Sequence, residues 1–222
     1  MLIGQCMQQN VITISPTTSH REAVQLLRDH NIRRLPVVSH GKLVGIVSEK
    51  DLLSSQPSPA TTLSVYEIFA LLDKMPVKQI MSQPVISVGP ECTLEDAATI
   101  ILTKKIGCLP VVKDQQLIGI ITESDIFRLF VEVLGGNVPG SKFTIELSDT
   151  PGKLAEVCMA VANAGGNIIS VTSLPTNDKQ VREVTVKERG ANTDVLREAL
   201  HKLGAGVVEF HASIPYSPVM AE

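Results

Sequence analysis

The feature that most constrains the fold of this chain is an internal repeat. Moving residues 6–53 along the sequence by 74 positions places them on residues 80–127 without a gap. Sixteen of the 48 aligned pairs are identical, and most other core positions exchange one apolar residue for another. A match of this length indicates two copies of one structural unit. Because neither copy is large enough to bury a sheet alone, we expect the two copies to pack face to face.

Both copies predict the same order of elements, a βαββα unit. In the first copy, VITI (residues 11–14) predicts a strand, and a capping box at Ser19 predicts the start of a helix. LPVV (35–38) is continuously apolar, which indicates a strand buried on both faces. LVGIVS (43–48) predicts a further strand that leads into a second helix. In the second copy, VISV (85–88) begins the same series.

A loop and an amphipathic helix are predicted between the two copies. SSQPSPATT (residues 54–62) has the composition of a loop. SVYEIFALLDKM (64–75) places apolar residues at helical spacing, and we interpret it as a linker helix that supports the second copy.

After the Gly/Pro-rich segment 135–140 the pattern changes. FTIEL begins a βαββαβ series with later strands at 168–174, 181–188 and 206–214, which predicts a small ferredoxin-like α+β sandwich. The first helix of this series is predicted to have Asp149 or Thr150 as its cap and Pro151 at its first position. Glycines at 165 and 166 are predicted to end this helix, and residues 193–204 to form the second.

Each copy carries a heptapeptide of one pattern: GIVSEKD (45–51) and GIITESD (119–125). Each heptapeptide closes a strand and opens a helix, and the free N–H groups of a helix start suit a phosphate. An aspartate only accepts hydrogen bonds, so it suits the two hydroxyls of a ribose. A structural alternative stays open, in which Ser48 and Thr122 cap the helices and the aspartates complement the helix dipoles.

On these residues the doubled unit resembles a tandem pair of CBS domains, a Bateman module. The matching features are PVV after the first helix of each copy and the two heptapeptides. SDTPGKL (148–154) and GGNI (165–168) resemble parts of an ACT domain, and the whole order is similar to AcuB-type acetoin-utilisation proteins. The expected domains are CBS repeat 1 at 1–60, the linker helix and CBS repeat 2 at 61–134, a linker at 135–141, an ACT domain at 142–214 and a flexible tail at 215–222.

The CBS resemblance implies an adenine nucleotide, AMP or ATP, bound as a regulatory ligand between the copies. In this family the heptapeptide of one copy faces the strand surface of the other. One cleft is therefore expected to contain Thr122, Ser124 and Asp125 with Met7, Ile12, Ile32, Arg33 and Arg34. The other is expected to contain Ser48, Lys50 and Asp51 with Met81, Ile86, Ile106, Gly107 and Cys108. Since arginines make bidentate phosphate contacts, the cleft closed by Thr122 and Asp125 is predicted to bind more tightly.

The ACT resemblance implies a small effector site, commonly for an amino acid, at an interface between two ACT domains. Its expected residues are Asp149, Thr150, Pro151, Gly152, Asn167 and Ile168. The structural alternative is that Asp149 caps a helix and Asn167 makes a turn. Both resemblances imply a homodimer.

Composition and motifs disfavour several other functions. A net charge of −3 and 3% aromatic residues disfavour nucleic-acid binding. No apolar run reaches the ~20 residues of a membrane span and no signal peptide is evident, so we predict a cytoplasmic protein. The four cysteines form no CxxC pair, and no catalytic motif is present. We predict a regulatory protein without catalytic activity that acts on an unknown partner. The alternatives are a ligand-free CBS dimerisation scaffold that senses only through its ACT domain, or a subunit of an acetoin-catabolism system. A third hypothesis is an enzyme with acetoin-linked or nucleotide-hydrolysing activity, which the absence of a catalytic motif disfavours.

Overall fold

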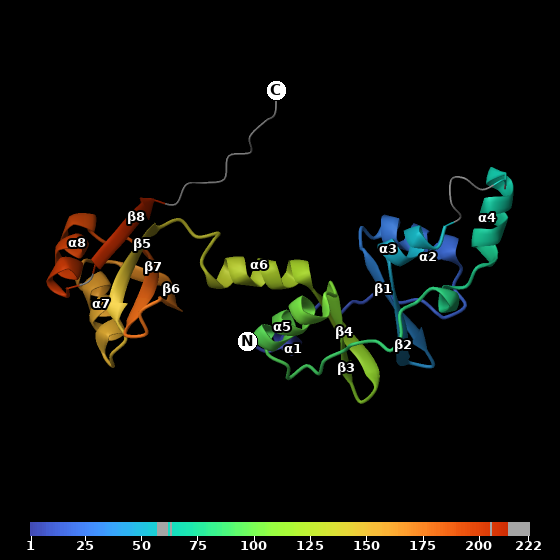
Figure 1. The fold of residues 1–222 in the computed structure, drawn as a ribbon, viewed down its shortest axis with the longest axis horizontal. Helices are drawn as coiled ribbons and strands as arrows, with labels where there is room; N and C mark the ends of the chain where they lie inside the picture. Colours follow the sequence, from blue (N-terminus) through green and yellow to red (C-terminus); the bar gives the residue numbers. More distant parts are fainter. Residues whose placement is uncertain (57–61, 63, 205, 213–222) are drawn as a thin grey trace, which may run out of the picture. The chain divides into compact units, whose positions relative to one another are not determined.

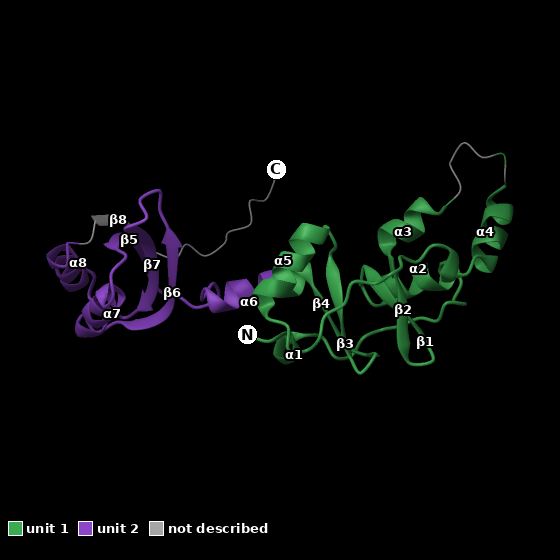
Figure 2. Ribbon diagram, turned by 60° about the horizontal axis from the view of Figure 1, so that its bottom comes forward, with its two compact units in different colours: residues 1–126 green, residues 127–222 purple. Residues whose placement is uncertain are grey.

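The computed structural model describes residues 1–56, 62, 64–204 and 206–212. The chain forms two compact units, residues 1–126 and 127–222 (Figure 2). They divide inside helix α6 (Glu123–Val133), whereas the sequence places the junction in the glycine-rich segment 135–141. The predicted tail, 215–222, and much of the predicted loop 54–62 lie outside the described residues.

The first unit contains one antiparallel sheet with the strand order β1-β2-β4-β3. Its two hairpins repeat each other, with a bulge after Val37 in one and after Val111 in the other. Each hairpin turns through two residues of positive φ, which matches the twist of the flanking strands. The hairpins meet where Lys42 pairs with Gln116. The strands are β1 (Arg34–Ser39), β2 (Lys42–Ser48), β3 (Cys108–Lys113) and β4 (Gln116–Thr122).

The helices of the first unit begin where the sequence predicts. The hydroxyl of Ser19 accepts a hydrogen bond from the N–H of Glu22 at 3.2 Å, and the Glu22 carboxylate accepts from the N–H of Ser19 at 2.9 Å. The hydroxyl of Thr93 caps the equivalent helix by accepting from the N–H of Asp96 at 3.1 Å, and it donates to Oδ2 of Asp96 at 2.8 Å. These helices are α2 (His20–Asp29) and α5 (Leu94–Lys104), and α3 (Glu49–Ser54) and α6 follow the hairpins (Figure 1).

The predicted strands at 11–14 and 85–88 are wrong in extent, because each is only a single parallel bridge. Ile14 donates to the carbonyl of Pro36 at 3.1 Å and accepts from the N–H of Val38 at 2.8 Å. The next bond on one side needs an N–H from Pro36, and on the other side an N–H from Pro16. Proline has none, so the ladder stops after one residue. The bridge between Val88 and Val111 is the equivalent in the second copy.

The two copies exchange their first segments. In α1 (Ile3–Cys6) the N–H of Gly4 donates to the carbonyl of Pro90 in the second copy at 2.8 Å. In the equivalent turn η1 (Val77–Gln79), the N–H of Lys78 donates to Pro16 of the first copy at 3.1 Å. Figure 1 shows α1 beside α5. This exchange, which the sequence did not predict, binds the copies together and extends the repeat in space to Ile3 and Val77.

Helix α4 (Val65–Lys74) packs against α2 of the first copy, which corrects the interpretation that it supports the second copy. Arg21 of α2 pairs with Asp73 at 3.2 Å, and its guanidinium lies 5.8 Å from the ring centre of Phe69. Helix α4 lies beside α2 because a hydrogen bond joins its C-terminal end to the start of α2. The carbonyl of Met75 accepts from the N–H of His20 at 2.8 Å.

The second unit has the predicted βαββαβ order and an antiparallel sheet in the ferredoxin-like order β6-β7-β5-β8. Buried residues of the sheet and both helices form one core, including Phe143, Val157 and Leu196. The elements are β5 (Ser141–Ser148), α7 (Lys153–Asn163), β6 (Asn167–Pro175), β7 (Val181–Arg189), α8 (Thr193–Lys202) and β8 (Gly206–Ala212). The last two residues of the strand predicted at 206–214 lie outside the described residues.

The predicted cap of the first helix in this unit is wrong. Helix α7 begins at Lys153, and its N-cap is Gly152, not Asp149 or Thr150. Gly152 has a φ of 93°, a left-handed conformation that glycine adopts readily. This conformation separates Pro151 from the helix, so the proline belongs to the preceding turn. As predicted, Gly165 follows the end of the helix with a φ of 82°.

The repeat core supports a stability test with matched leucines. Leu35 is fully buried in β1, whereas Leu102 of α5 is 73% exposed. We expect Leu35→Ala to lower the free energy of unfolding by about 2–5 kcal/mol because it leaves a cavity. Leu102→Ala is expected to change it by less than about 0.5 kcal/mol. Urea titrations followed by circular dichroism measure both values, and equal losses would contradict this core.

Candidate functional site

A cavity of about 440 Å³ lies in the first unit where residues of both copies meet. The first copy contributes the start of β1 and the junction of β2 with α3. The second copy contributes the segment before α5 and the start of β3. The lining residues are Arg33, Arg34, Ile46, Ser48, Glu49, Lys50, Asp51, Ser82, Pro84, Val85, Ile86, Lys105, Ile106, Gly107, Cys108 and Pro110.

Ser48 and Asp51 form the first heptapeptide's contribution to this cavity. The hydroxyl of Ser48 donates to Oδ2 of Asp51 at 2.7 Å, and the N–H of Ser48 donates to the same oxygen at 2.8 Å. The N–H of Asp51 donates back to the Ser48 hydroxyl at 3.2 Å. This pair therefore caps α3, which is the capping role that the structural alternative from the sequence gives to Ser48. Oδ1 of Asp51 accepts no hydrogen bond from any residue that the structure describes, so it can accept one from a ligand.

Arg33 and Arg34 also line the Asp51 cavity. The β1–β2 hairpin pairs Arg34 with Ser48, and the carbonyl of Arg33 accepts from the N–H of Glu49 at 2.9 Å. The guanidinium of Arg34 lies against Gly107 of the second copy, so closely that a methyl group added at Gly107 would overlap it. Within the described part of the chain, neither arginine forms an ion pair.

This placement corrects the assignment of the two arginines to the cleft of Thr122 and Asp125. The sequence reasoning paired each heptapeptide only with strands of the other copy, whereas hairpin pairing holds each strand start beside the heptapeptide of its own copy. Tighter binding was expected at Asp125 because arginines make bidentate phosphate contacts, and this argument therefore applies to the Asp51 cavity. Its lining includes four cationic side chains and two carboxylates, which gives a net charge of +2.

The second heptapeptide has the same internal hydrogen bonds but a different neighbour. Thr122 donates to Oδ2 of Asp125 from its N–H at 3.0 Å and from its hydroxyl at 2.7 Å. The side-chain amide of Gln8 donates to Oδ1 of Asp125 at 3.0 Å and to Oδ2 at 3.3 Å. Asp125 is only 3% exposed, whereas Asp51 is half-buried.

The structure places the other predicted residues of the two clefts as follows. Ile86, Ile106, Gly107 and Cys108 line the Asp51 cavity with Ser48 and Lys50, as predicted. The predicted methionines lie beside the strand glycines, since a methyl group at Gly45 would meet Met81 and one at Gly119 would meet Met7. Ile12 and Ile32 pack against the core of the first copy, and Ser124 is exposed.

The buried Cys108 shows that part of the cavity wall is apolar. Burial raises the pKa of its thiol to about 11, against the opposite effect of the positive charge of Arg34. The thiol is 4% exposed, so it is an apolar part of the wall and not a nucleophile at neutral pH.

Sequence reasoning missed Gln8 and also several lining residues, including Ser82, Val85 and Lys105. The repeat offers the signal that would have found them. A shift of 74 residues places Gln8 on Ser82, and the residues before β1 on those before β3. Each position that lines one cleft therefore has an equivalent that can be compared in the other copy.

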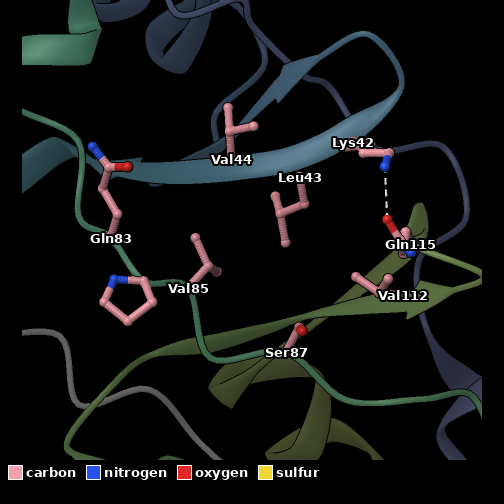
Figure 3. A pocket seen from close by; sticks show the side chains of 9 residues that line it. Lys42, Leu43, Val44, Gln83, Val85, Ser87, Val112 and Gln115 are labelled. Carbon is pink, nitrogen blue, oxygen red and sulfur yellow. Dashed lines mark hydrogen bonds between the residues drawn. The ribbon is translucent and has the colours of Figure 1, made fainter.

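A wider groove of about 820 Å³ lies beside this cavity (Figure 3). Its walls include Leu43, Val85 and Val112, and the amine of Lys42 donates to Oε1 of Gln115 at 2.7 Å across one end. Its lining has one charged group and no carboxylate. The smaller cavity differs from this groove, because its lining combines the Asp51 carboxylate with Arg33 and Arg34.

The second unit contains a cavity of about 220 Å³ beside the start of α7. Arg182 donates to the hydroxyl of Ser173 at 2.6 Å and lies 3.5 Å from a carboxylate oxygen of Asp149. The lining residues are Leu147, Ser148, Asp149, Thr150, Lys153, Leu154, Ser173, Arg182 and Val184.

Within one chain, the predicted effector residues are only partly together. Asp149 and Thr150 line this cavity, but Pro151 and Gly152 do not. Asn167 and Ile168 pair with Arg189 and Glu188, whereas Ser148 pairs with Val181 near the other end of β7. The physical reason is α7, whose 11 residues carry the chain about 16 Å along the sheet before β6 begins.

Among the residues that the structure describes, no group of three or more His, Cys, Asp or Glu side chains is arranged to hold a metal ion. Over the same ranges, no helix is long and apolar enough to cross a membrane.

Fold and cavity together define a protein of two exchanged α/β repeats with a cationic cavity at their junction. The pattern of the CBS domain matches residues 3–58 and 77–132, and the chain belongs to this family.

Three comparisons show how far the likeness extends. Inosine-5′-monophosphate dehydrogenase of Korarchaeum cryptofilum (strain OPF8) is 42% identical over 120 residues, which cover 54% of this chain and 22% of the dehydrogenase. The chain thus spans about a fifth of that relative's length. A Vibrio cholerae chain assigned as an acetoin utilization protein (AcuB) is 33% identical with a TM-score of 0.53, over 62% of this chain and 95% of that one. The CBS domain pair of protein MJ0100, in complex with 5′-methylthioadenosine and S-adenosyl-L-methionine, is 30% identical with a TM-score of 0.50, over 62% and 98%.

The cavity wall gives a test by thiol labelling. Since the pKa of Cys108 is about 11, about one thiol in a thousand is ionised at pH 8. We expect iodoacetamide to modify the half-buried Cys158 well before Cys108 in the native protein, by mass spectrometry of peptides. Labelling of Cys108 is expected to speed up as pH rises toward 11, and equal rates for both thiols at pH 8 would contradict this description.

Proposed function

We propose that the chain is a regulatory protein without catalytic activity, whose repeat pair binds an adenine nucleotide in the Asp51 cavity. The observation that carries the proposal is one cavity lined by Asp51, Arg33 and Arg34. Among the residues that the structure describes, Oδ1 of Asp51 accepts no hydrogen bond and neither arginine forms an ion pair. The MJ0100 domain pair, which shares the family and the fold, holds two adenosine compounds. The cavity volume of about 440 Å³ lies in the usual range for small-molecule sites, about 300–1,000 Å³.

Each part of the nucleotide has a chemical counterpart in the lining. The ribose diol offers two O–H donors, and Oδ1 of Asp51 is an acceptor. The phosphates suit the guanidinium groups of Arg33 and Arg34, which donate in a bidentate manner. Ile86 and Ile106 offer apolar surface for the adenine ring.

The charge of the cavity favours one class of adenosine compound. A lining with a net charge of +2 attracts AMP or ATP, which carry negative phosphates. S-adenosyl-L-methionine has a sulfonium, an ammonium and one carboxylate, so it is positively charged overall and this lining favours it less. We therefore propose a phosphate-bearing nucleotide as the ligand.

Regulation follows from where the ligand lies. Residues of both copies line the cavity, so a nucleotide bound there favours arrangements in which the two copies are held at the distance that it bridges. The proposal includes a homodimer and a regulated partner protein as the readout, and a role in acetoin utilisation is one candidate, because of the likeness to the Vibrio cholerae chain. The alternative is an empty CBS scaffold.

A carboxylate substitution tests the proposed site. Asp51→Asn replaces the acceptor in the cavity by an amide, and a charged hydrogen bond contributes about 1.5–3 kcal/mol. We expect it to weaken ATP binding by about 10–100-fold in calorimetry.

The matched control is Asp125→Asn, whose carboxylate already accepts from Gln8. We expect this variant to change the affinity by less than about threefold. A larger loss at Asp125 than at Asp51 would support the expectation from the sequence and contradict the proposed site, and wild-type protein that binds no nucleotide at millimolar concentration would refute the function.

For the second unit we propose an ACT domain that binds an amino acid in the Asp149 cavity. Its support is the βαββαβ order together with Arg182 and Lys153, two cations that suit a carboxylate. An amino acid at 100 times its Kd is expected to stabilise the unit by about 2.7 kcal/mol.

Thermal-shift measurements with the twenty amino acids test this, with Arg182→Gln as the variant that loses the shift. ATP in the same assay is the control, because its stabilisation is expected to survive Arg182→Gln. If no amino acid raises the melting temperature, this second proposal is wrong; if only amino acids do, the empty-scaffold alternative is favoured.

A further inference from the structure

The two heptapeptides differ in their surroundings at one position that the exchange of segments brings beside each aspartate. In the second copy that position is Gln8, and in the first copy it is Ser82. The N–H of Gln8 donates to the carbonyl of Ile120 at 2.9 Å and its carbonyl accepts from Ile120 at 3.0 Å. Ser82 makes the same two bonds with Ile46, at 2.9 and 3.2 Å. The two backbones are therefore held in equivalent positions, and only the side chains differ.

This one difference changes the state of the aspartate. The Gln8 amide reaches both carboxylate oxygens of Asp125, at 3.0 and 3.3 Å. The side chain of Ser82 is two atoms shorter from Cβ to its polar end, and it forms no hydrogen bond with Asp51 in the described part of the chain. Asp125 is 3% exposed, whereas Asp51 is half-buried and lines the cavity.

We infer that Gln8 is a built-in competitor of the ligand, which occupies the Asp125 carboxylate and limits the chain to one nucleotide. The amide N–H groups of Gln8 donate to the atoms that would accept from a ribose diol. A ligand at Asp125 would first have to break these hydrogen bonds, after which the Gln8 amide would have to form hydrogen bonds with water instead. The inference rests on the proposed function of the Asp51 cavity and adds Gln8 to the two arginines as a residue that makes the two sites unequal.

The reciprocal exchange of the two side chains offers a direct test. Gln8→Ser copies the first cleft, and Ser82→Gln copies the second, while both backbones keep their hydrogen bonds. Because position 8 and position 82 are exposed, both variants are expected to fold. Circular dichroism and melting temperatures confirm this before any titration.

Calorimetric titration with ATP is the measurement. Wild-type protein is expected to bind one ATP per chain, and Gln8→Ser is expected to bind two with the first affinity unchanged. The added site is expected to disappear in Gln8→Ser with Asp125→Asn. Ser82→Gln is expected to weaken the Asp51 site by about tenfold or more, since the amide then competes there.

The outcomes separate this inference from the proposed function. Two ATP per wild-type chain, or a Gln8→Ser variant that gains no Asp125-dependent site, would overturn the inference. A wild type without ATP and a Gln8→Ser variant with one Asp125-dependent ATP would overturn the proposed Asp51 site and support the role of Gln8.

Discussion

The exchange of segments between the two repeats is the constraint on which the rest of the first unit depends. Residues before each βαββα unit form their backbone hydrogen bonds with the other copy, through Gly4 and Pro90 on one side and Lys78 and Pro16 on the other. A single copy would leave these donors and acceptors without partners and would expose the face of its sheet. The exchange also places Gln8 and Ser82 beside the strands that end at the two aspartates.

The inequality of the two clefts follows from this arrangement. An exchange with twofold symmetry would build two equal sites if the two copies had the same sequence. The backbones of the two copies are equivalent, but their side chains differ at the points of contact. The first copy has Arg33 and Arg34 where the second has Gly107 and Cys108, and Gln8 is equivalent to Ser82. The Asp51 cavity therefore has a positive lining and an oxygen, Oδ1 of Asp51, that accepts no hydrogen bond from a described residue. The Asp125 carboxylate instead accepts hydrogen bonds from Gln8.

Much of this architecture could be predicted from the sequence, because the repeat and the apolar runs encode contacts that are local or duplicated. The hairpins, the capping boxes and the βαββαβ order of the second unit depend on such patterns. Two features needed the structure. The bridges at Ile14 and Val88 are one residue long because prolines flank them on both strands, and apolar composition alone does not show where a partner lacks an N–H. The place of Arg33 and Arg34 depends on hairpin register, which pairs Arg34 with Ser48.

The site residues were predicted in the same uneven way. The heptapeptides and the segment at Ile106–Cys108 follow a pattern and were found. Gln8 carries no motif, and its role depends on a contact with a residue 117 positions away. The effector residues of the second unit were predicted as one group, but α7 separates Asp149 from Asn167 along the sheet within a chain.

A crystal structure of the protein grown with ATP tests the central claim most directly. The account predicts one ATP per chain, with its ribose hydroxyls on Oδ1 of Asp51, its phosphates near Arg33 and Arg34, and Gln8 still bonded to Asp125. An ATP molecule at Thr122 and Asp125 with Gln8 displaced, and an empty Asp51 cavity, would contradict it.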